Sequence, residues 1–558
     1  MKQAVTSAQA SARIPLQTIE RDPRRWGALA ACCIVAFSEL VEPRLHHMGL
    51  RIPHDAFGAS FHQFQILNSF TIILFMTSML LGGFLGDLLG RRRVFLFGAV
   101  GYVVGNVLVA SAMSIEWFIA ARIFVAISGG MVLPLTLATI RTIFDDREER
   151  IIAIVLYTIT TSAASLLALL AILIEANFGW RATLIPPILA GTLGTALAWN
   201  YLPFSKALGG FRRADALAAA VWSLLFLGLM YGLLLVQFII HGGLRFIFIS
   251  IILIGLGAIS FGVARWQQRS ARESENVHQV PVYALTMLLF ISAALSFALI
   301  NYPLRLYNYF LVVRELGFVL SGFALLPFLI TMLSLVRPTV TLTERYSMPL
   351  LIAGGMGLMA TGMLLTAGAG TTTPYILMIA PMVIFTFGYL IASSAWSNAF
   401  LNVIPKDLVG INVGMSRAAG AAGSTIGGLL LSAILISVGQ RTLEQRALEQ
   451  GLPPEQLDYA VAALNAVLQN EEPMLPVENI PPELVSALLM SNYREAYMSG
   501  LAAGWMLVGV IYFAIVLVIW FGLRWVAAHE PTAATVIRTQ PLTPPAATSV
   551  PPPADSTA

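Results

Sequence analysis

The chain has 558 residues, of which 57% are hydrophobic and only 11% are charged. So few charges cannot cover the surface of a soluble protein of this length. The formal charge of +4 comes mainly from short connections, where basic residues set membrane topology, so we exclude nucleic acid as a partner. The composition predicts an all-α polytopic membrane protein that is solvated by a lipid bilayer.

Long apolar runs follow one another along the chain. Each is close to the roughly 20 residues that an α-helix needs to cross about 30 Å of hydrocarbon. We predict fourteen membrane-spanning helices, at residues 26–43, 63–86, 93–113, 117–140, 151–175, 182–202, 215–240, 246–264, 281–301, 317–340, 348–369, 374–400, 409–438 and 496–524. An even number of spans puts both chain ends on one side of the membrane.

Basic residues gather in alternate connections. The run 91–93 follows the second predicted span, and Arg141 and Arg150 follow the fourth, whereas residues 241–243 include no Lys or Arg. Because positively charged connections stay inside, this asymmetry predicts that both termini are cytoplasmic. We expect a multi-pass protein of the plasma membrane, the inner membrane in a bacterium.

The stretch after the second predicted span carries the most specific pattern. It reads Gly83-Phe84-Leu85-Gly86-Asp87-Leu88-Leu89-Gly90-Arg91-Arg92-Arg93. Small glycines permit close helix approach, and Gly90 permits a tight turn. The Asp87 carboxylate accepts hydrogen bonds from a neighbouring helix end or an arginine. We predict a conformational latch, made of Gly83, Asp87, Gly90, Arg91, Arg92 and Arg93.

This stretch resembles the signature loop of the major facilitator superfamily. Farther along, Gly179-Trp180-Arg181 is similar to the motif before the sixth helix in the fourteen-helix drug:proton antiporter branch. The resemblance implies two six-helix bundles plus two extra central helices, and multidrug efflux by alternating access. One departure is the fifth span, where residues 162–170 lack the Gly-Pro pair that is usual in antiporters.

On this basis we divide the chain into five parts. They are a cytoplasmic tail at 1–25, a six-helix bundle at 26–202, two extra helices with linkers at 203–280, a second six-helix bundle at 281–525, and a disordered cytoplasmic tail at 526–558. An outer insertion at 440–492 carries apolar residues at helical spacing, which predicts short amphipathic helices. A surface cap, a lid and a partner-docking element are the alternatives for this insertion.

Ionisable residues inside a membrane mark functional positions. Glu39 lies 13 residues after Trp26, about 20 Å along an outward-running helix, and Arg122 lies at a similar depth on the fourth span. We predict that Glu39 is the proton-coupling acid and Arg122 its charge partner. Glu42, one turn farther out, is the alternative acid, and a static ion pair is the alternative to a coupling role.

Other polar or aromatic side chains in the spans are candidates for a substrate cavity, with helix packing as the alternative. They are Phe37, Ser38, Gln65, Asn68, Tyr389, Trp396 and Asn398. The histidines between 43 and 63 have no diagnostic metal spacing, and Cys32 and Cys33 are adjacent, so we predict no metal site. No nucleotide-binding motif or catalytic arrangement occurs in the sequence, and we predict no cofactor and no enzymatic activity.

The leading function is proton-coupled export of small amphipathic organic compounds. Its rivals are uptake or facilitated transport of a specific solute by the same fold, and a non-transporting membrane sensor. The absent Gly-Pro pair favours the first rival, whereas the Asp87 loop argues against the second. The resemblance also implies a periplasmic adaptor protein as a partner of the outer insertion.

Overall fold

A computed structural model describes residues 24–47, 57, 61–144, 146–204, 225, 228, 255, 262, 282–404, 409–449 and 482–529. The predicted spans at 215–240 and 246–264 lie outside these residues apart from single positions, so the count of fourteen stays a prediction. Within the described part no strand occurs, and nine helices are long and apolar enough to cross a membrane. The all-α membrane fold is confirmed.

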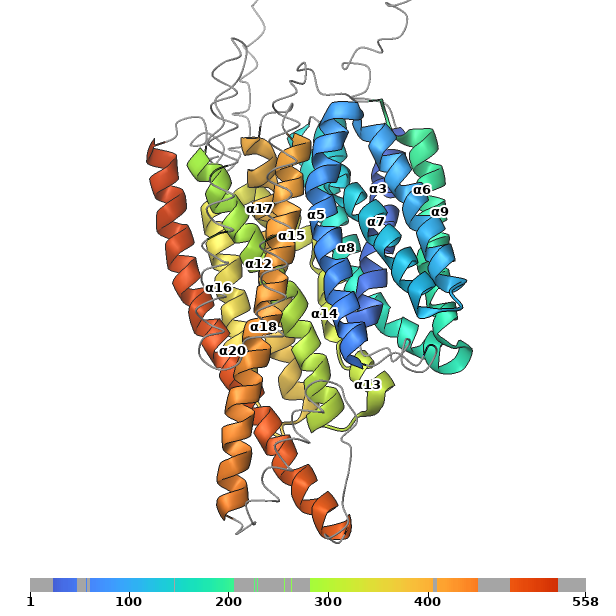
Figure 1. Cartoon of the computed structure of the whole chain (residues 1–558). Coiled ribbons are helices and arrows are strands. Elements are labelled where there is room, and N and C mark those ends of the chain that lie inside the picture. Colours follow the sequence, from blue (N-terminus) through green and yellow to red (C-terminus); the bar gives the residue numbers. More distant parts are fainter. Residues whose placement is uncertain are drawn as a thin grey trace, which may run out of the picture.

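The described helices fall into two groups by sequence and packing (Figure 1). The N-terminal half contains α3 (Arg24–His47), α5 (Phe61–Leu89), α6 (Arg91–Ala110), α7 (Ile115–Ile143), α8 (Arg147–Phe178), the 3₁₀ turn η1 (Trp180–Leu184) and α9 (Ile185–Tyr201). The C-terminal half contains α12 (Val282–Asn308), the π turn η2 (Tyr309–Val313), α13 (Gly317–Phe323), α14 (Leu326–Ser334), α15 (Val336–Arg345), α16 (Met348–Ala367), α17 (Tyr375–Val403), α18 (Val409–Glu449) and α20 (Pro482–His529).

Two seams join the halves. Along one seam, α18 packs against α5 and α7, and along the other, α8 packs against α13, α14, α15 and α17. Most other contacts stay within a half, such as α3 with α9, α6 with α7, and α16 with α17. Helix contacts of this kind bury the polar backbone and leave apolar side chains such as Phe97, Leu189 and Leu517 on the outside, where a bilayer solvates them.

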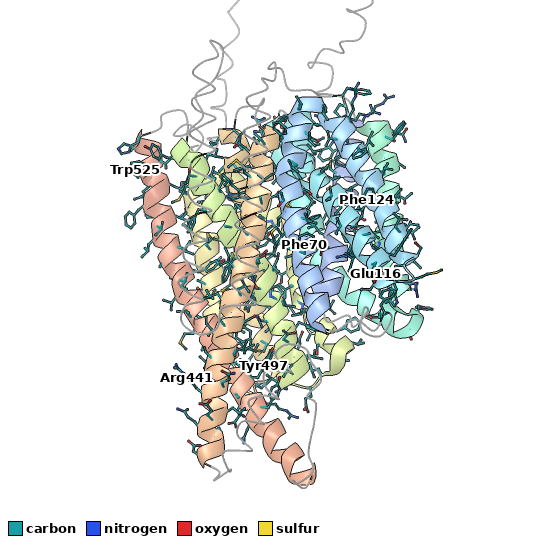
Figure 2. All side chains as sticks on the ribbon, viewed as in Figure 1. Phe70, Glu116, Phe124, Arg441, Tyr497 and Trp525 are labelled. Carbon is teal, nitrogen blue, oxygen red and sulfur yellow. The ribbon has the colours of Figure 1, made fainter. Side chains whose placement is uncertain are left out.

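Both described chain ends lie at one end of the bundle. Arg25 pairs with Glu149 at 2.6 Å, which places the start of α3 beside the start of α8. The rings of Tyr283 and Trp525 lie 5.2 Å apart, which places the end of α20 beside the start of α12. Figures 1 and 2 show these ends at the top, with Glu116 and Arg441 toward the opposite end. We name the top the Gly90 end, after the α5–α6 connection.

Two sequence predictions about helix bounds are wrong. The single span expected at 317–340 is three consecutive helices. Pro327, which has no N–H to continue a helix from α13, lies in the first turn of α14. The insertion expected at 440–492 begins and ends inside long helices, since α18 continues to Glu449 and α20 starts at Pro482. The amphipathic repeat from Leu457 to Leu468 lies outside the described residues.

Close packing of α16 on α17 depends on a pair of glycines. A Cβ atom on Gly355 would lie 2.6 Å from the Gly388 carbonyl oxygen, whereas a Cβ atom on Gly354 would meet nothing within 4 Å. A methyl group at Gly355 would therefore clash with α17, whereas a methyl group at Gly354 would clash with nothing. Gly355 faces a helix and Gly354 faces outward.

We expect Gly355→Ala to destabilise the folded protein by about 1–3 kcal/mol, because α16 and α17 must move apart. Gly354→Ala is the matched control and should leave stability unchanged or raise it, since alanine favours the helix. Thermal unfolding of both purified variants in detergent checks this. Equal melting temperatures for the two would contradict the packing described.

Candidate functional site

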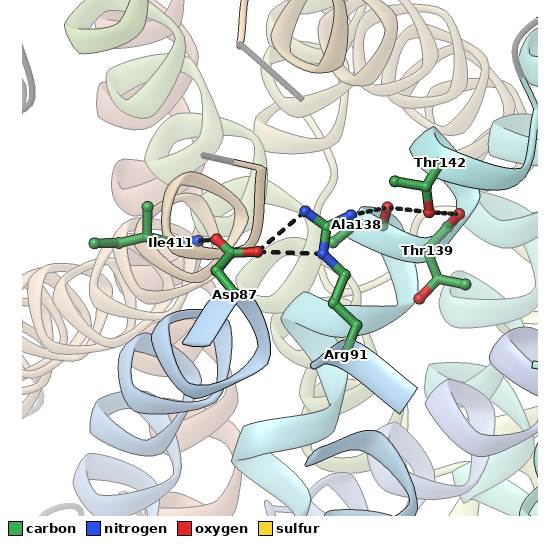
Figure 3. A network of polar contacts seen from close by, with 6 residues as sticks. All are labelled: Asp87, Arg91, Ala138, Thr139, Thr142 and Ile411. Carbon is green, nitrogen blue, oxygen red and sulfur yellow. Dashed lines mark hydrogen bonds and ion pairs between the residues drawn. The ribbon is translucent and has the colours of Figure 1, made fainter. Parts of the chain in front are cut away.

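Asp87 joins the two halves at the Gly90 end (Figure 3). Its Oδ1 atom accepts hydrogen bonds from Arg91 at 3.2 Å (Nε) and 3.0 Å (Nη2), and its Oδ2 atom accepts one from the backbone N–H of Ile411 at 3.0 Å. Ile411 lies in the first turn of α18, where free N–H groups and the helix dipole favour an anion. The carboxylate thus lies between an arginine of its own half and a helix end of the other half.

The local sequence explains this geometry. Gly90 has a φ of 101°, a value that glycine adopts readily, so α6 begins directly after α5 and Arg91 comes one turn after Asp87. A Cβ atom on Gly83 would overlap the Gly410 carbonyl oxygen, so glycine there lets α5 approach α18. Arg91 also donates to the Ala138 carbonyl at 3.4 Å, which ties α7 into the network.

The three arginines of the motif have different contacts. Arg91 is buried against Asp87. Arg92 instead donates to the Trp199 carbonyl, lies 4.1 Å from the Phe204 ring centroid, and so stays within the N-terminal half. Arg93 is exposed. The sequence pattern could not separate them, because all three follow the same turn.

Two more arginines bridge the halves at this end. Arg141 of α7 donates to the Leu401 carbonyl at 2.9 Å, and Arg150 of α8 donates to Asn402 Oδ1 at 3.0 Å. Both partners belong to the last turn of α17. Sequence reasoning treated these arginines only as topological signals, and no local signal identifies their partners on a helix some 250 residues away.

A deeper contact also crosses between the halves. Arg417 Nη2 of α18 donates to the Tyr157 hydroxyl of α8 at 3.0 Å, and the guanidinium carbon lies 5.5 Å from the Tyr157 ring centroid. The hydroxyls of Tyr157 and Thr136 are 2.8 Å apart. This contact was missed by sequence reasoning, because the two residues lie 260 positions apart in the chain.

Glu39 lies buried in the N-terminal half. Its exposed fraction is 0%, and neither carboxyl oxygen has a hydrogen-bond partner in the described part of the chain. The preceding residue is fixed on two sides: Ser38 Oγ donates to the Pro187 carbonyl at 2.6 Å, and the Tyr102 hydroxyl donates to the Ser38 carbonyl at 2.7 Å. These bonds hold α3 against α9 and α6.

The predicted contact between Glu39 and Arg122 is not formed in this conformation. Arg122 is also buried, with 6% of its surface exposed, but no hydrogen bond or ion pair joins it to Glu39. The prediction compared only depths along two helices, and equal depth does not make two side chains face each other. The Glu42 side chain lies outside the described residues.

Comparison with known proteins agrees with this architecture. The sequence profile of the Major Facilitator Superfamily matches residues 28–225. The multidrug efflux pump LfrA of Mycolicibacterium smegmatis is 24% identical over 492 residues, which cover 87% of this chain and 94% of LfrA. The structure of the proton:xylose symporter XylE, a member of this superfamily, has a TM-score of 0.53 at 14% identity and covers 89% of this chain and 95% of XylE.

Over residues 28–225 the chain is similar to the major facilitator superfamily. A further relative, a chloramphenicol resistance protein of Pseudomonas aeruginosa, is 31% identical over 174 residues, which cover 31% of this chain and 40% of that protein. The sequence-based resemblance is thereby confirmed. The major facilitator fold, which XylE shares, accounts for the two groups of helices and the seams between them.

The side chains that we predicted for a substrate cavity have varied surroundings. Trp396 Nε1 donates to the Leu288 carbonyl at 2.7 Å, and Asn398 Nδ2 donates to the Ser394 carbonyl at 3.0 Å. Tyr389 is buried and Phe37 is half-buried. Gln65 and Asn68 belong to α5, but their side chains lie outside the described residues. Ser38 and Trp396 therefore have hydrogen bonds to other helices, whereas Asn398 bonds back to its own helix, and a role in substrate contact stays a prediction.

Among the described residues, no group of three or more His, Cys, Asp or Glu residues would hold a metal ion. Cys32 and Cys33 are both buried free thiols. These are the chain's only two cysteines, which makes them natural reporters of opening.

We expect Asp87→Ala to open the Gly90 end, because the substitution removes a charge-assisted hydrogen bond to each half. Each such bond contributes about 1.5–3 kcal/mol. Labelling of Cys32 and Cys33 by a water-soluble maleimide should accelerate by at least about tenfold in the purified variant.

Arg92→Gln is the matched comparison, since Arg92 contacts only its own half among the interactions described. This substitution removes one positive charge of the motif but no contact between the two halves, so labelling of Cys32 and Cys33 should stay slow. Similar labelling rates in the Asp87 variant and the wild type would show that Asp87 does not hold the two halves together.

Proposed function

We propose that this chain is a proton-coupled exporter of amphipathic organic compounds, of the fourteen-helix drug:proton antiporter type. Support comes from the relatives named for multidrug efflux and chloramphenicol resistance, one of which matches along nearly its whole length. The substrate would cross without covalent change, so the proposal includes no enzymatic step and no cofactor. The domain boundaries predicted from the sequence belong to the same proposal.

The environment of Glu39 carries this proposal. An ionised carboxylate that is buried without a donor costs several kcal/mol, whereas a neutral carboxylic acid costs far less. The conformation described here therefore accommodates the neutral acid. Loss of the proton requires another conformation, in which water or Arg122 reaches the carboxylate. Proton binding at Glu39 is in this way linked to the exchange between conformations. Glu42 is the alternative acid.

Alternating access follows from the bridging contacts. Asp87, Arg141 and Arg150 close the Gly90 end in this conformation, and breaking their contacts would let the halves separate there. With the positive residues inside, the Gly90 end and both termini are cytoplasmic, in the inner membrane of a bacterium. The substrate would bind between the halves near the membrane midplane, among the candidate cavity residues.

The opposite end projects beyond the bilayer. α18 has 41 residues and α20 has 48, so they are about 60 and 70 Å long, twice the hydrocarbon thickness or more. Arg446 pairs with Glu495 at 2.8 Å, and Thr442 lies 2.8 Å from Ser499, which holds the two projecting helices together. In this proposal a periplasmic adaptor would dock on the projecting ends of α18 and α20. Shortening both helices should then abolish co-purification of the adaptor with this protein.

We expect Glu39→Gln to abolish proton-driven accumulation in everted vesicles, because glutamine is neutral at every pH. Wild-type protein should accumulate a fluorescent amphiphile when the lumen is acidic, as protons leave and substrate enters. Exchange of substrate without a proton gradient should persist in the variant.

Glu116→Gln is the matched control. Glu116 is an exposed acid in the first turn of α7, so its replacement should leave coupling intact. Undiminished proton-driven accumulation in Glu39→Gln would remove Glu39 from the mechanism. Wild-type protein that equilibrates a solute but never accumulates it would instead favour facilitated transport.

A further inference from the structure

Arg417 is an arginine inside a membrane helix without an acidic partner. Among the described residues its side chain donates one hydrogen bond, to the neutral Tyr157 hydroxyl, and its Nε atom is buried with no hydrogen-bond partner. No ion pair joins it to a described Asp or Glu. A guanidinium has five N–H donors in a planar fork that matches a carboxylate, so Tyr157 leaves most of its capacity unused.

The position of this contact places it between the two seams. α18 belongs to the seam with α5 and α7, whereas α8 belongs to the seam with α13, α14, α15 and α17. The bond from Arg417 to Tyr157 therefore spans the space between the seams, where substrate would pass. A cation held there by one hydroxyl is placed to meet substrate as soon as the halves separate.

Three helices independently give the depth of this contact. Arg417 follows Ile411 by 6 residues on α18, Tyr157 follows Arg150 by 7 on α8, and Thr136 precedes Arg141 by 5 on α7. At 1.5 Å per residue these separations are about 9, 10 and 8 Å. The Arg417 contact thus forms a second layer, inside the layer of bridging contacts at the Gly90 end.

The Tyr157 hydroxyl is itself held in place. It lies 2.8 Å from Thr136 Oγ1, which in turn lies 2.6 Å from the Leu133 carbonyl. The Tyr157 oxygen accepts from Arg417 and the Thr136 hydroxyl is within reach of both Tyr157 and Leu133. The chain of hydrogen bonds is complete without a negative charge. It positions the phenol oxygen against the guanidinium but leaves the positive charge of Arg417 uncompensated.

We propose that Arg417 binds a carboxylate group of the transported amphiphile, and that Tyr157 occupies this position while the Gly90 end is closed. The inference rests on the proposed export function and names its substrate class. When the halves separate, α18 carries Arg417 away from α8 and Tyr157, and a substrate carboxylate forms two hydrogen bonds with the fork. Glu39 lies 15 residues after the start of α3 and Arg417 lies 8 residues after the start of α18, about 22 and 12 Å along these helices, so proton and carboxylate occupy different layers.

The test compares two probes that differ only in charge, dansyl-leucine and its isosteric amide dansyl-leucinamide. Affinity for the purified full-length protein is measured by dansyl fluorescence and calorimetry. Wild-type protein should bind the carboxylate at least about tenfold more tightly than the amide. Arg417→Gln should remove this preference, and Arg417→Lys should retain part of it. Tyr157→Phe should strengthen carboxylate binding severalfold, because it removes the oxygen that competes for Arg417.

Arg305→Gln is the matched control. Arg305 is another arginine in a membrane helix, but it donates to Ser432 and to the Gly428 carbonyl within its own half. The preference for the carboxylate should survive its replacement. If Arg417→Gln does not fold, Arg417→Lys and Tyr157→Phe decide the question, because both keep the site's volume.

Two results would overturn the inference. One is that wild-type protein binds the two probes with equal affinity or does not bind the carboxylate probe at all. The other is that substitutions of Arg417 leave the preference for the carboxylate probe unchanged. Binding needs neither a proton gradient nor net transport. Equal binding together with intact proton-driven export would therefore reject the role of Arg417 alone. If wild-type protein showed no proton-driven export but preferred the carboxylate probe in a way that depends on Arg417, only the coupling mechanism would be rejected.

Discussion

A charged side chain inside a hydrocarbon layer needs a partner, and the contacts between the two halves of this protein follow from that constraint. Asp87 obtains two partners, Arg91 and the N-terminus of α18, and in doing so ties one half to the other. Arg417 has a neutral partner and Glu39 has none among the described residues. The three groups lie at increasing distance from the Gly90 end, so charge compensation decreases with depth from that end.

The fold was largely predictable from the sequence, because lipid solvation imposes a signal on every span. Runs of about twenty apolar residues marked most described helices, whereas the division of 317–340 into three helices, the extension of α12 to Asn308 and the long ends of α18 and α20 were missed. Pro327 alone did not reveal that a helix ends there, because a proline within an apolar run also occurs in continuous helices, as Pro134 does in α7. The long ends escaped because polar helices outside the bilayer carry no hydropathy signal.

The site was only partly predictable. Asp87 and Gly90 stood out, since a tight turn and an adjacent acid leave a local pattern. The sequence did not reveal the partners of four residues, Asp87, Arg141, Arg150 and Tyr157. Each pairs with a residue more than 240 positions away, and such pairing depends on the rotation of each helix about its axis. Depth along the membrane was a poor substitute: Glu39 and Arg122 share a depth but make no contact in this conformation.

The central claim is that the proton on Glu39 selects between conformations of the two halves. Distance measurements between spin labels at Arg93 and Tyr346, exposed residues of opposite halves near the Gly90 end, test it most directly in protein lacking the native cysteines. The account predicts that the distances in the otherwise native protein change with pH, and that Glu39→Gln shows the low-pH distances at every pH. A pH-dependent change that persists in Glu39→Gln would contradict it.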